Sequence, residues 1–495
     1  MNFQNIRTAF HCEMQILTPV HIGNGEKYVN NFDFLCEANR ARVFDHKRLF
    51  AMVEQLGGSH IESFAAAMED GQLTHWLRSN NININEAVVH SFSFPAHNEP
   101  RDINRHIRDG FGRPIIPGSS LKGVFRTAIL ARLADDNRTN PVNQALGNLM
   151  KPGKVNVKFA DSSLCTELLG EDAKMNLMRS LTVADFTFAP EDVQVQNAYV
   201  TRLTNSTRFV RKPWSIWIEK LNQSANASGQ VSFDDFLITQ AKGKEAFNFK
   251  ADLTLVWLVE ALRKRTDKAL NSELDFLRDK NGDGIDGMRG FYTKLKQDHQ
   301  NLPENEAIVQ FAWGSGWKGM TGELLGPELL TSEVRSKLKL ANKYLNFPFP
   351  KSRRVAVTGV AALPMGWIRL RFTSKEEIRR AEAFKVQEEK RAQQVKIEQE
   401  QQQKNEQEAW GKMSEVEQCV AIIRGETIAR SHATGQDQDA NCWKKIETAS
   451  PEEQKSLALA FKEIWINDPK KWAKKQCSKK QWEKVQKVKT ILGEM

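Results

Sequence analysis

The pattern of hydrophobic and polar positions changes period several times along the first three quarters of the chain. Phe10–Leu17 has the composition of a strand, and residues 87–94 alternate apolar and polar side chains as a half-buried strand does. Residues 45–80 instead carry apolar side chains at helical spacing. Two further apolar strands are predicted at 307–313 and 366–372. Strands and helices therefore interleave, which predicts an α+β fold for residues 1–374.

The pattern shifts sharply at residue 375. Residues 375–409 are rich in strong helix formers, contain no Gly or Pro and have few apolar positions. We expect a solvated, charged helical linker, because a coiled coil would need apolar a and d positions through several heptads. Residues 410–495 return to a helical pattern and predict a small, basic, all-α module.

Lysines and tryptophans are interleaved at the end of this module. Residues 451–495 hold 11 lysines against 6 acidic side chains, together with Trp465, Trp472 and Trp482. The tryptophans can form the core of a three- or four-helix bundle with a basic exterior, which is the favoured interpretation. Alternatively, they can stack on a nucleic-acid strand that the lysines attract.

Composition narrows the classes of partner. The chain has 495 residues, enough for about three domains of ~150 residues. Its net charge is 71 − 61 = +10, which favours polyanions and nucleic acid above all. There is no apolar signal region and no run of the ~20 apolar residues that a membrane span needs, so we expect a cytoplasmic protein without membrane contact.

The cysteines argue against a metal or disulfide framework. Six are scattered along the chain without a C-x-x-C pair, so we expect reduced, mostly buried thiols. Residues 279–290 open like a calcium loop, but position 12 is Gly290 instead of a bidentate Glu. A surface turn is the better interpretation, and no metal or cofactor is expected.

The most informative segment is Gly112–Arg132, which predicts a short strand, a Pro-Gly turn and a Ser-capped helix. One face should be buried, since its apolar residues follow helical spacing: Leu121, Val124, Phe125, Ala128 and Ile129. Lys122 and Arg126 share another face. The free N–H groups of a helix start, the small Gly118 and Gly123 and the charge of Lys122 together suit a phosphate. The structural alternative is a plain capped helix after a turn.

A glycine-rich loop is predicted at 311–319. It satisfies G-x-G-x-x-G, but no second strand ending in an acidic residue follows about 20 positions on, which disfavours a dinucleotide fold. The amides of Gly314 and Gly316, with Trp317 and Lys318, suit a strand of RNA better. A tight structural loop is the alternative.

A third cluster of cations follows a proline-bearing segment. Lys351, Arg353 and Arg354 lie within four residues, directly after FPFP. Phosphate contact and a solvated charge run are equally good interpretations.

These motifs together resemble a known family. LTPVHIGNG, IPGSSLKGVFRTA, WGSGWKGMTG, FPFPKSRR and LPMGWIRLRF are similar, in order and spacing, to RAMP proteins of type III CRISPR effector complexes, and most closely to the fifth subunits of type III-A (Csm) complexes. The resemblance covers about residues 10–374. It implies tandem ferredoxin-like, RRM-type domains and a non-catalytic subunit that binds CRISPR RNA (crRNA), caps the backbone filament at the 3′ side of the guide and supports crRNA maturation and antiviral defence.

The resemblance also implies partners and contacts. The partners would be crRNA, the backbone RAMP subunits and the small helical subunit, with target RNA as a further candidate. The residues carried over to face the guide backbone are Gly118, Ser119, Ser120, Lys122, Gly123, Arg126, Gly314, Gly316 and Lys318. Phosphate contacts carry no sequence information, which suits a protein that must accept every spacer.

Two other classes of function stay open at this point. Some RAMP relatives are metal-independent endoribonucleases, and His21 on the loop after the first strand would be the general base, with Lys122 stabilising the phosphorane. A histidine in such a loop is more often a hydrogen-bonded anchor, and His21 is also a candidate RNA contact. A pure protein adaptor would assemble without RNA and be indifferent to Lys122.

Overall fold

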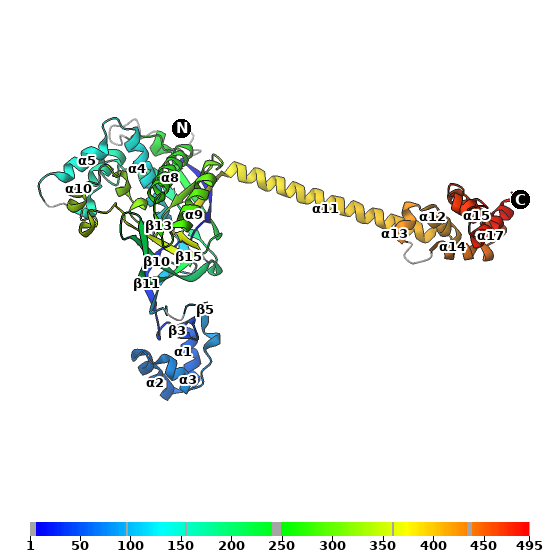
Figure 1. The fold of residues 1–495 in the computed structure, drawn as a ribbon, viewed down its shortest axis with the longest axis horizontal. Coiled ribbons are helices and arrows are strands. Elements are labelled where there is room, and N and C mark those ends of the chain that lie inside the picture. Colours follow the sequence, from blue (N-terminus) through cyan, green and yellow to red (C-terminus); the bar gives the residue numbers. More distant parts are fainter. Residues whose placement is uncertain are drawn as a thin grey trace. The chain divides into compact units, whose positions relative to one another are not determined.

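The chain forms two compact units, Met1–Ile378 and Arg379–Met495 (Figure 1). The computed structural model describes residues 6–95, 98–153, 156–239, 249–358, 361–432 and 438–494. Within these ranges no helix is both long enough and apolar enough to cross a membrane.

An antiparallel sheet of five strands, the central sheet, organises the first unit. Its strands, in sheet order, are β14 (Glu306–Gln310), β17 (Trp367–Ser374), β1 (Arg7–Ile16), β12 (Asn226–Asp234) and β8 (Leu181–Val183). Side chains along β1 alternate, so Cys12, Met14 and Ile16 are buried on one face and Glu13 and Gln15 lie on the other. The strands predicted at 10–17, 307–313 and 366–372 are confirmed, as β1, β14 and β17.

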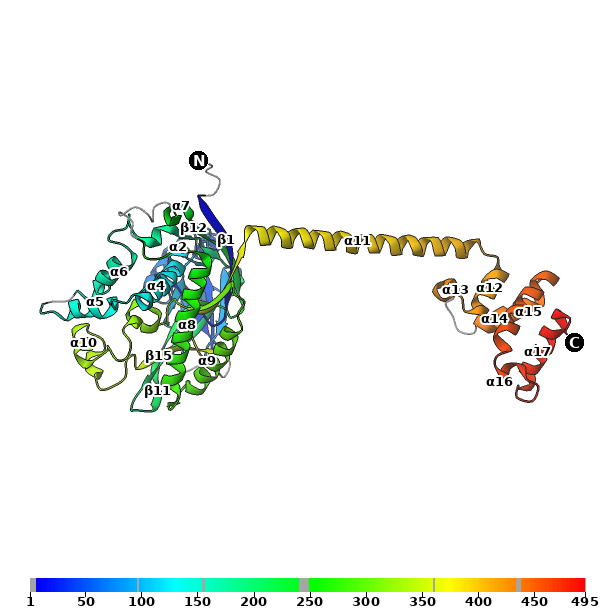
Figure 2. The ribbon, with the colours of Figure 1, turned by 90° about the horizontal axis from the view of Figure 1, so that it is seen from above.

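Two long helices cover the buried face of the central sheet. They are α4 (Gly118–Asp136) and α8 (Leu255–Leu277), which lie side by side against it (Figure 2). Phe125 of α4, Leu258 of α8 and Met14 of β1 belong to one hydrophobic core. All five residues predicted for the buried face of α4 are in this core.

A second sheet packs beside a second core. Its strands, in order, are β16 (Ala361–Pro364), β15 (Ser352–Thr358), β10 (Val193–Leu203), β11 (Arg208–Leu221), β6 (Asp102–His106) and β2 (Gly23–Val29), and β13 (Asn281–Gly282) pairs with β11. Met288 and Tyr292 of α9 (Ile285–Gln300) pack there with Tyr199 and Phe209. The calcium-like loop is a turn before α9, where a carboxylate oxygen of Asp283 accepts the backbone N–H of Arg211 at 2.6 Å.

A small subdomain holds its own core within the first unit. It combines β3 (Phe34–Glu37), β4 (Arg40–Phe44) and β5 (Val88–Ser93) with α1 (His46–Glu54), α2 (Gly58–Glu69) and α3 (Leu73–Ser79). The helical stretch predicted at 45–80 is thus three helices. Gly57 and Gly71, with φ of 96° and 66°, lie between them in left-handed backbone that interrupts a helix.

The remaining α-helices and strands of the first unit are short. They are β7 (Ile115–Ile116), β9 (Phe186–Thr187), α5 (Pro141–Met150), α6 (Ser162–Leu169), α7 (Asp235–Thr239) and α10 (Ser332–Lys337).

Helices make up the described part of the second unit. They are α11 (Lys375–Lys412), which begins in the first unit, α12 (Glu415–Arg424), α13 (Thr427–His432), α14 (Gln438–Thr448), α15 (Pro451–Trp465), α16 (Pro469–Trp472) and α17 (Lys479–Leu492). Leu457, Phe461 and Trp465 of α15 pack with Ile446 and Val485 in a separate core.

The mixed α+β character of the chain is confirmed, but the thiols differ from expectation. None of the six cysteines, all of which lie in the described ranges, forms a disulfide, yet only Cys12 and Cys442 are buried. The prediction of mostly buried thiols is wrong because the other four lie where the cores cover them only in part.

Candidate nucleic-acid interface

Helix α4 begins at the segment predicted to bind a phosphate, but its first turn is not held by the predicted serine cap. Pro117 is the N-cap residue and no side chain caps the helix there, so the expected serine cap is wrong. Instead, the backbone N–H of Gly118 donates to Oδ1 of Asp185 at 2.7 Å. A Cβ on Gly118 would lie 2.1 Å from the carbonyl oxygen of Val183. Gly118 therefore serves close packing of α4 against β8, and its N–H is already bonded.

The next turn of α4 keeps its polar groups open. Lys122 is half-buried, and no acceptor or carboxylate pairs with its ammonium among the residues that the structure describes. Burial lowers the pKa of this ammonium. A Cβ on Gly123 would meet nothing within 4 Å, so backbone can be approached closely here. An uncompensated cation beside an open glycine is an arrangement that an anion would stabilise.

Arg126, one turn further along α4, is partly neutralised. One of its guanidinium nitrogens lies 2.7 Å from Sγ of Cys165 and 3.6 Å from a carboxylate oxygen of Asp161. Its side chain is 37% exposed. Arg126 can therefore contact a phosphate only in competition with Asp161.

A groove joins α4 to the glycine-rich loop, two motifs that lie almost 200 residues apart in sequence. It encloses about 520 Å³ and is lined by Ser120, Gly123 and Arg126 on one side and by Ser315 and Trp317 on the other. Much of the remaining lining is apolar, from α5, α6 and residues 320–340. The fold thus brings together two of the predicted contact segments, while Ser119 is exposed at the start of α4.

The glycine-rich loop lies between this groove and a second cavity of about 430 Å³, which Ser315 and Trp317 also line. Gly314 and Gly316 have φ of 103° and 65°, which other residues rarely adopt. Gly316 faces open space, whereas a Cβ on Gly314 would lie 3.0 Å from Met365. The ring of Trp317 packs edge-on against Phe349 at 5.2 Å, so the loop is both a tight structural turn and a cavity wall.

Two of the cations predicted to contact RNA form ion pairs with a buried carboxylate instead. Glu273 of α8 is 3% exposed, and its carboxylate receives Lys318 Nζ at 2.6 Å and Arg353 Nε at 2.8 Å. Burial alone would raise the pKa of the Glu273 carboxyl, but the charges of Arg353 and Lys318 outweigh it and lower the pKa to about 2. The positive charge of Lys318 and Arg353 is therefore shared with a buried anion.

Lys351 and Arg354, by contrast, rest on aromatic rings. Lys351 Nζ lies 3.6 Å from the ring centroid of Tyr344, and the Arg354 guanidinium lies 4.1 Å from that of Trp313. Across the described ranges neither cation forms an ion pair with a carboxylate. Both keep their charge available, Arg354 on β15 and Lys351 directly before it.

Sequence reasoning missed two cations beside Lys351. Burial lowers the pKa of the Lys351 ammonium, and repulsion from Arg202 of β10 and Lys212 of β11 lowers it further. Because β15, β10 and β11 are neighbours in the second sheet, three strands bring these cations to one surface. For Lys212 the sequence signal was the group of basic residues Arg208, Arg211 and Lys212 at the start of β11, and no comparable group surrounds Arg202.

His21 is a buried anchor of its loop. It is 3% exposed, and its Nδ1 lies 2.6 Å from the carbonyl oxygen of Glu219. Its ring packs edge-on against Trp313 at 5.7 Å and lies 6.1 Å from the ring of His106, a neighbour that the sequence did not suggest. Burial lowers the pKa of the His21 imidazole. His21 is therefore shielded from an RNA strand.

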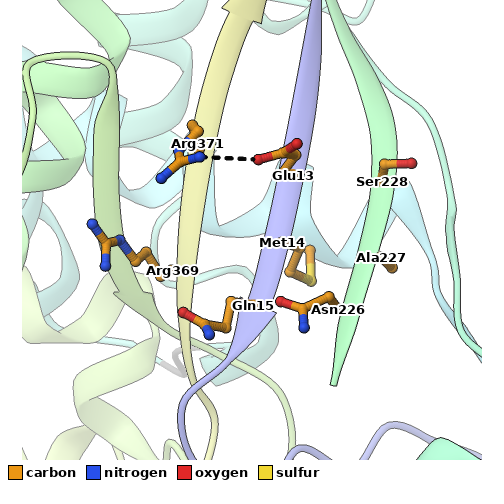
Figure 3. Close-up of a pocket in the computed structure, with 8 residues that line it drawn as sticks. All are labelled: Glu13, Met14, Gln15, Asn226, Ala227, Ser228, Arg369 and Arg371. Carbon is orange, nitrogen blue, oxygen red and sulfur yellow. Dashed lines mark ion pairs between the residues drawn. The ribbon is translucent and has the colours of Figure 1, made fainter. Parts of the chain in front are cut away.

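A further cavity, of about 500 Å³, lies on the exposed face of the central sheet, where Arg369 and Arg371 face Glu13, Gln15 and Asn226 (Figure 3). Glu306, 1% exposed, pairs with both arginines, and Arg371 also lies 3.6 Å from Glu13. Two carboxylates thus balance two guanidiniums, which makes this cavity a poor phosphate site.

Among the described residues no three His, Cys, Asp or Glu side chains gather as metal ligands.

Comparison with known proteins shows the family to which this chain belongs. The profile of the RAMP superfamily matches residues 13–295, which contain α4, α8, the end of β1, the central-sheet strands β8 and β12, and most strands of the second sheet. The chain belongs to the RAMP superfamily. This RAMP protein is 32% identical over 165 residues to the CRISPR system Cms protein Csm5 of Streptococcus thermophilus, a match covering 30% of this chain and 46% of that protein. It is 26% identical over 156 residues to Csm5 of Mycobacterium tuberculosis, covering 27% and 41%. Both matches span less than half of the relative's length.

We call the first unit, Met1–Ile378, the RAMP unit. Solved structures share the fold of this chain over about three quarters of its length. A chain in the cryo-EM structure of a Csm–crRNA–target RNA ternary complex of a type III-A CRISPR-Cas system superposes with a TM-score of 0.58 at 22% identity, over 73% of this chain and 100% of that one. The crystal structure of T. onnurineus Csm5 gives a TM-score of 0.50 at 20% identity, over 72% and 99%. The C-terminal extension of this RAMP protein has no counterpart in these relatives.

Proposed function

We propose that this RAMP protein is a crRNA-binding subunit of a type III-A CRISPR effector (Csm) complex. In that complex it would cap the backbone filament at the 3′ side of the guide and support crRNA maturation without cutting RNA itself. Family membership, similarity to Csm5 proteins and a fold shared with a chain of a Csm–crRNA–target RNA complex support this proposal. Its partners would be crRNA, the backbone RAMP subunits and the small helical subunit, in the cytoplasm.

One observation carries the RNA-binding part of this proposal: Lys122 is a half-buried cation without a partner, next to the open backbone of Gly123. Leaving a charge partly desolvated and unpaired costs free energy, which a bound phosphate would offset. Gly123 lines a groove that reaches the glycine-rich loop, so a strand held at α4 would have a path across both motifs.

The proposed contact surface differs from the sequence-based set. It keeps the α4 face and Gly316, and it adds the cations of the second sheet. It leaves out Gly118, which packs against β8, His21, which is buried, and Lys318 and Arg353, which neutralise Glu273. The cations it relies on are Lys122, Lys351, Arg354, Arg202 and Lys212.

We also propose a ferredoxin-like domain as the scaffold of this surface. The order β17-β1-β12-β8, with α4 after β1 and α8 after β12, follows the β-α-β-β-α-β path of that fold. Strand β14 is then an addition at the edge. The second ferredoxin-like unit and the division at 374 and 409 stay predictions.

The endoribonuclease alternative loses its best candidate residue. A general base must come within about 2.6–3.2 Å of the proton it removes. With His21 at 3% exposure and its Nδ1 bonded to a backbone carbonyl, that approach would require the loop to open.

The test is Lys122→Ala in the full chain, measured by binding of a labelled crRNA-length single strand at several salt concentrations. Each phosphate contact to single-stranded RNA contributes about 0.7 to the slope of log K against log salt, so the slope should become shallower by about that amount while affinity falls. Lys174→Ala is the matched control, because Lys174 is an exposed lysine on the same unit. Unchanged affinity and slope in a folded Lys122→Ala protein would refute the proposed contact.

A further inference from the structure

The positive charge of the chain is concentrated in one short segment. Residues 469–489 contain 9 lysines and 1 glutamate, a net charge of 9 − 1 = +8. The whole chain carries +10, so all other residues together carry only 10 − 8 = +2. Helix α11, by contrast, carries no net charge, since residues 375–412 hold 9 basic and 9 acidic side chains. The signal that favoured a polyanion thus arises outside the proposed crRNA surface.

Six of these lysines form a surface that we call the lysine cluster. Its members are Lys470, Lys471, Lys474, Lys475, Lys479 and Lys480. All six are exposed, and none forms an ion pair with a described carboxylate. Other lysines of this unit are paired: Lys487 lies 2.8 Å from Glu447, and Lys462 and Lys445 pair with Glu494 and Glu415. The cluster therefore keeps its full charge on the surface.

The lysine cluster stands on an ordered support. Asp468 caps α16 by accepting the N–H of Lys470 at 3.0 Å, and Ser478 caps α17 by accepting that of Gln481 at 3.2 Å. The side-chain amide of Gln481 donates to the carbonyl of Lys471 at 3.1 Å, which ties α17 to α16. The cations are thus held close together on a fixed scaffold, where they repel one another until an anion binds.

The tryptophans lie behind this surface. Trp465 is 8% exposed in the core, and Trp472 and Trp482 are partly buried beneath Lys489, whose Nζ lies 5.3 and 5.7 Å from their ring centroids. The rings therefore support the helices, whereas the lysines of the cluster are exposed. Of the two sequence-based interpretations, the structure favours a tryptophan-containing core with a basic exterior. Such an exterior would contact phosphates and make no sequence-specific contacts to bases.

We propose that the lysine cluster is a second nucleic-acid site, which binds the phosphodiester backbone of RNA or DNA without sequence preference. Closely spaced lysines match the regular charge of a nucleic acid, since each contact releases a condensed counterion. A membrane surface is disfavoured, because no large apolar side chain in 469–489 is exposed. This proposal stands independently of the crRNA surface, because none of its residues lies in the RAMP unit.

The test uses the full chain and two labelled probes of arbitrary sequence, a 20-base-pair DNA duplex and a 20-nucleotide RNA strand, titrated at several salt concentrations. The variant K470Q/K471Q/K474Q/K475Q removes four charges of the cluster. The control K390Q/K396Q/K404Q/K412Q removes four charges from exposed positions of α11. At about 0.9 per phosphate, the cluster variant should bind duplex at least tenfold more weakly at low salt, with a slope shallower by about 3 to 4, while the control changes little.

Two results would overturn the proposal: equal losses in both variants, or no loss in the cluster variant, whether or not that variant also fails to co-purify with a protein partner. Unchanged probe binding together with loss of a co-purifying partner would assign the cluster to an acidic protein. Weakened binding of one probe only would confirm the site and identify RNA or DNA as its ligand. Lys122→Ala should leave duplex binding unchanged, so failure of this proposal is distinguishable from failure of the crRNA proposal.

Discussion

Glu273 is the residue on which the arrangement around the glycine-rich loop depends. Replacing it by Gln would leave Lys318 and Arg353 without their anion in a buried site. We expect Glu273→Gln to lower the free energy of unfolding by about 3–5 kcal/mol, measured by urea denaturation. Glu13→Gln is the control, because Glu13 is 52% exposed and removing such a surface pair should cost at most about 1 kcal/mol.

The same residue predicts a pH dependence. The pKa of the Glu273 carboxyl is about 2 in the folded state, below the ~4.3 of an unfolded chain. Its stabilisation is therefore complete above about pH 4.3 and is lost as the pH falls from there through about 2. Glu273→Gln should lack this part of the acid dependence, and an identical acid profile in the two proteins would contradict it.

Residue roles were the least predictable feature from the sequence. Lys318 and Arg353 have the residue types of phosphate contacts, and nothing local shows that a carboxylate 45 or 80 positions away neutralises them. His21 could be read as an anchor from its loop, but its neighbour His106 is supplied by β6, far along the chain. Charge and burial of this kind depend on tertiary packing.

At the scale of elements, the two glycines of α4 should respond in opposite ways. Gly118→Ala would place a Cβ 2.1 Å from the Val183 carbonyl, so it should lower the melting temperature. Gly123→Ala has open space and gains about 1 kcal/mol of helix propensity, so it should hold or raise the melting temperature. Calorimetry of both variants is the measurement. A stable Gly118→Ala protein would show that α4 does not need this close approach to β8.

The body of α4 was predictable and its start was not. Helical spacing identified five core residues of α4 correctly, since burial repeats with the period of the helix, but it did not include Leu130 and Leu133, which are buried in the same core. Its N-terminal anchor is Asp185, which lies 67 residues away and follows β8. Likewise, alternation located β1 and β17, but only the folded chain shows that they are neighbours in one sheet.

At the scale of the whole molecule, composition indicated a polyanion partner without locating its site. The +8 of residues 469–489 accounts for most of the net charge, whereas the crRNA surface rests on a few cations placed by strands and a helix from distant parts of the sequence. Motif order predicted the family, because those motifs are local strings, and it predicted nothing about the extension, which matches no relative.

Truncation after residue 408 separates the two proposed sites. The hydrophobic cores of the RAMP unit contain no residue beyond 378, and the core of the second unit contains none before 416, so the RAMP unit should fold without the extension. We expect the truncated protein to bind crRNA with affinity within about twofold of the full chain and to lose the salt-sensitive binding of arbitrary duplex. Titration of both probes, with a melting curve as the control for folding, measures this. Loss of crRNA binding from a folded truncated protein would mean that the extension completes the guide site, and loss of the assembled complex alone would give it a role in assembly.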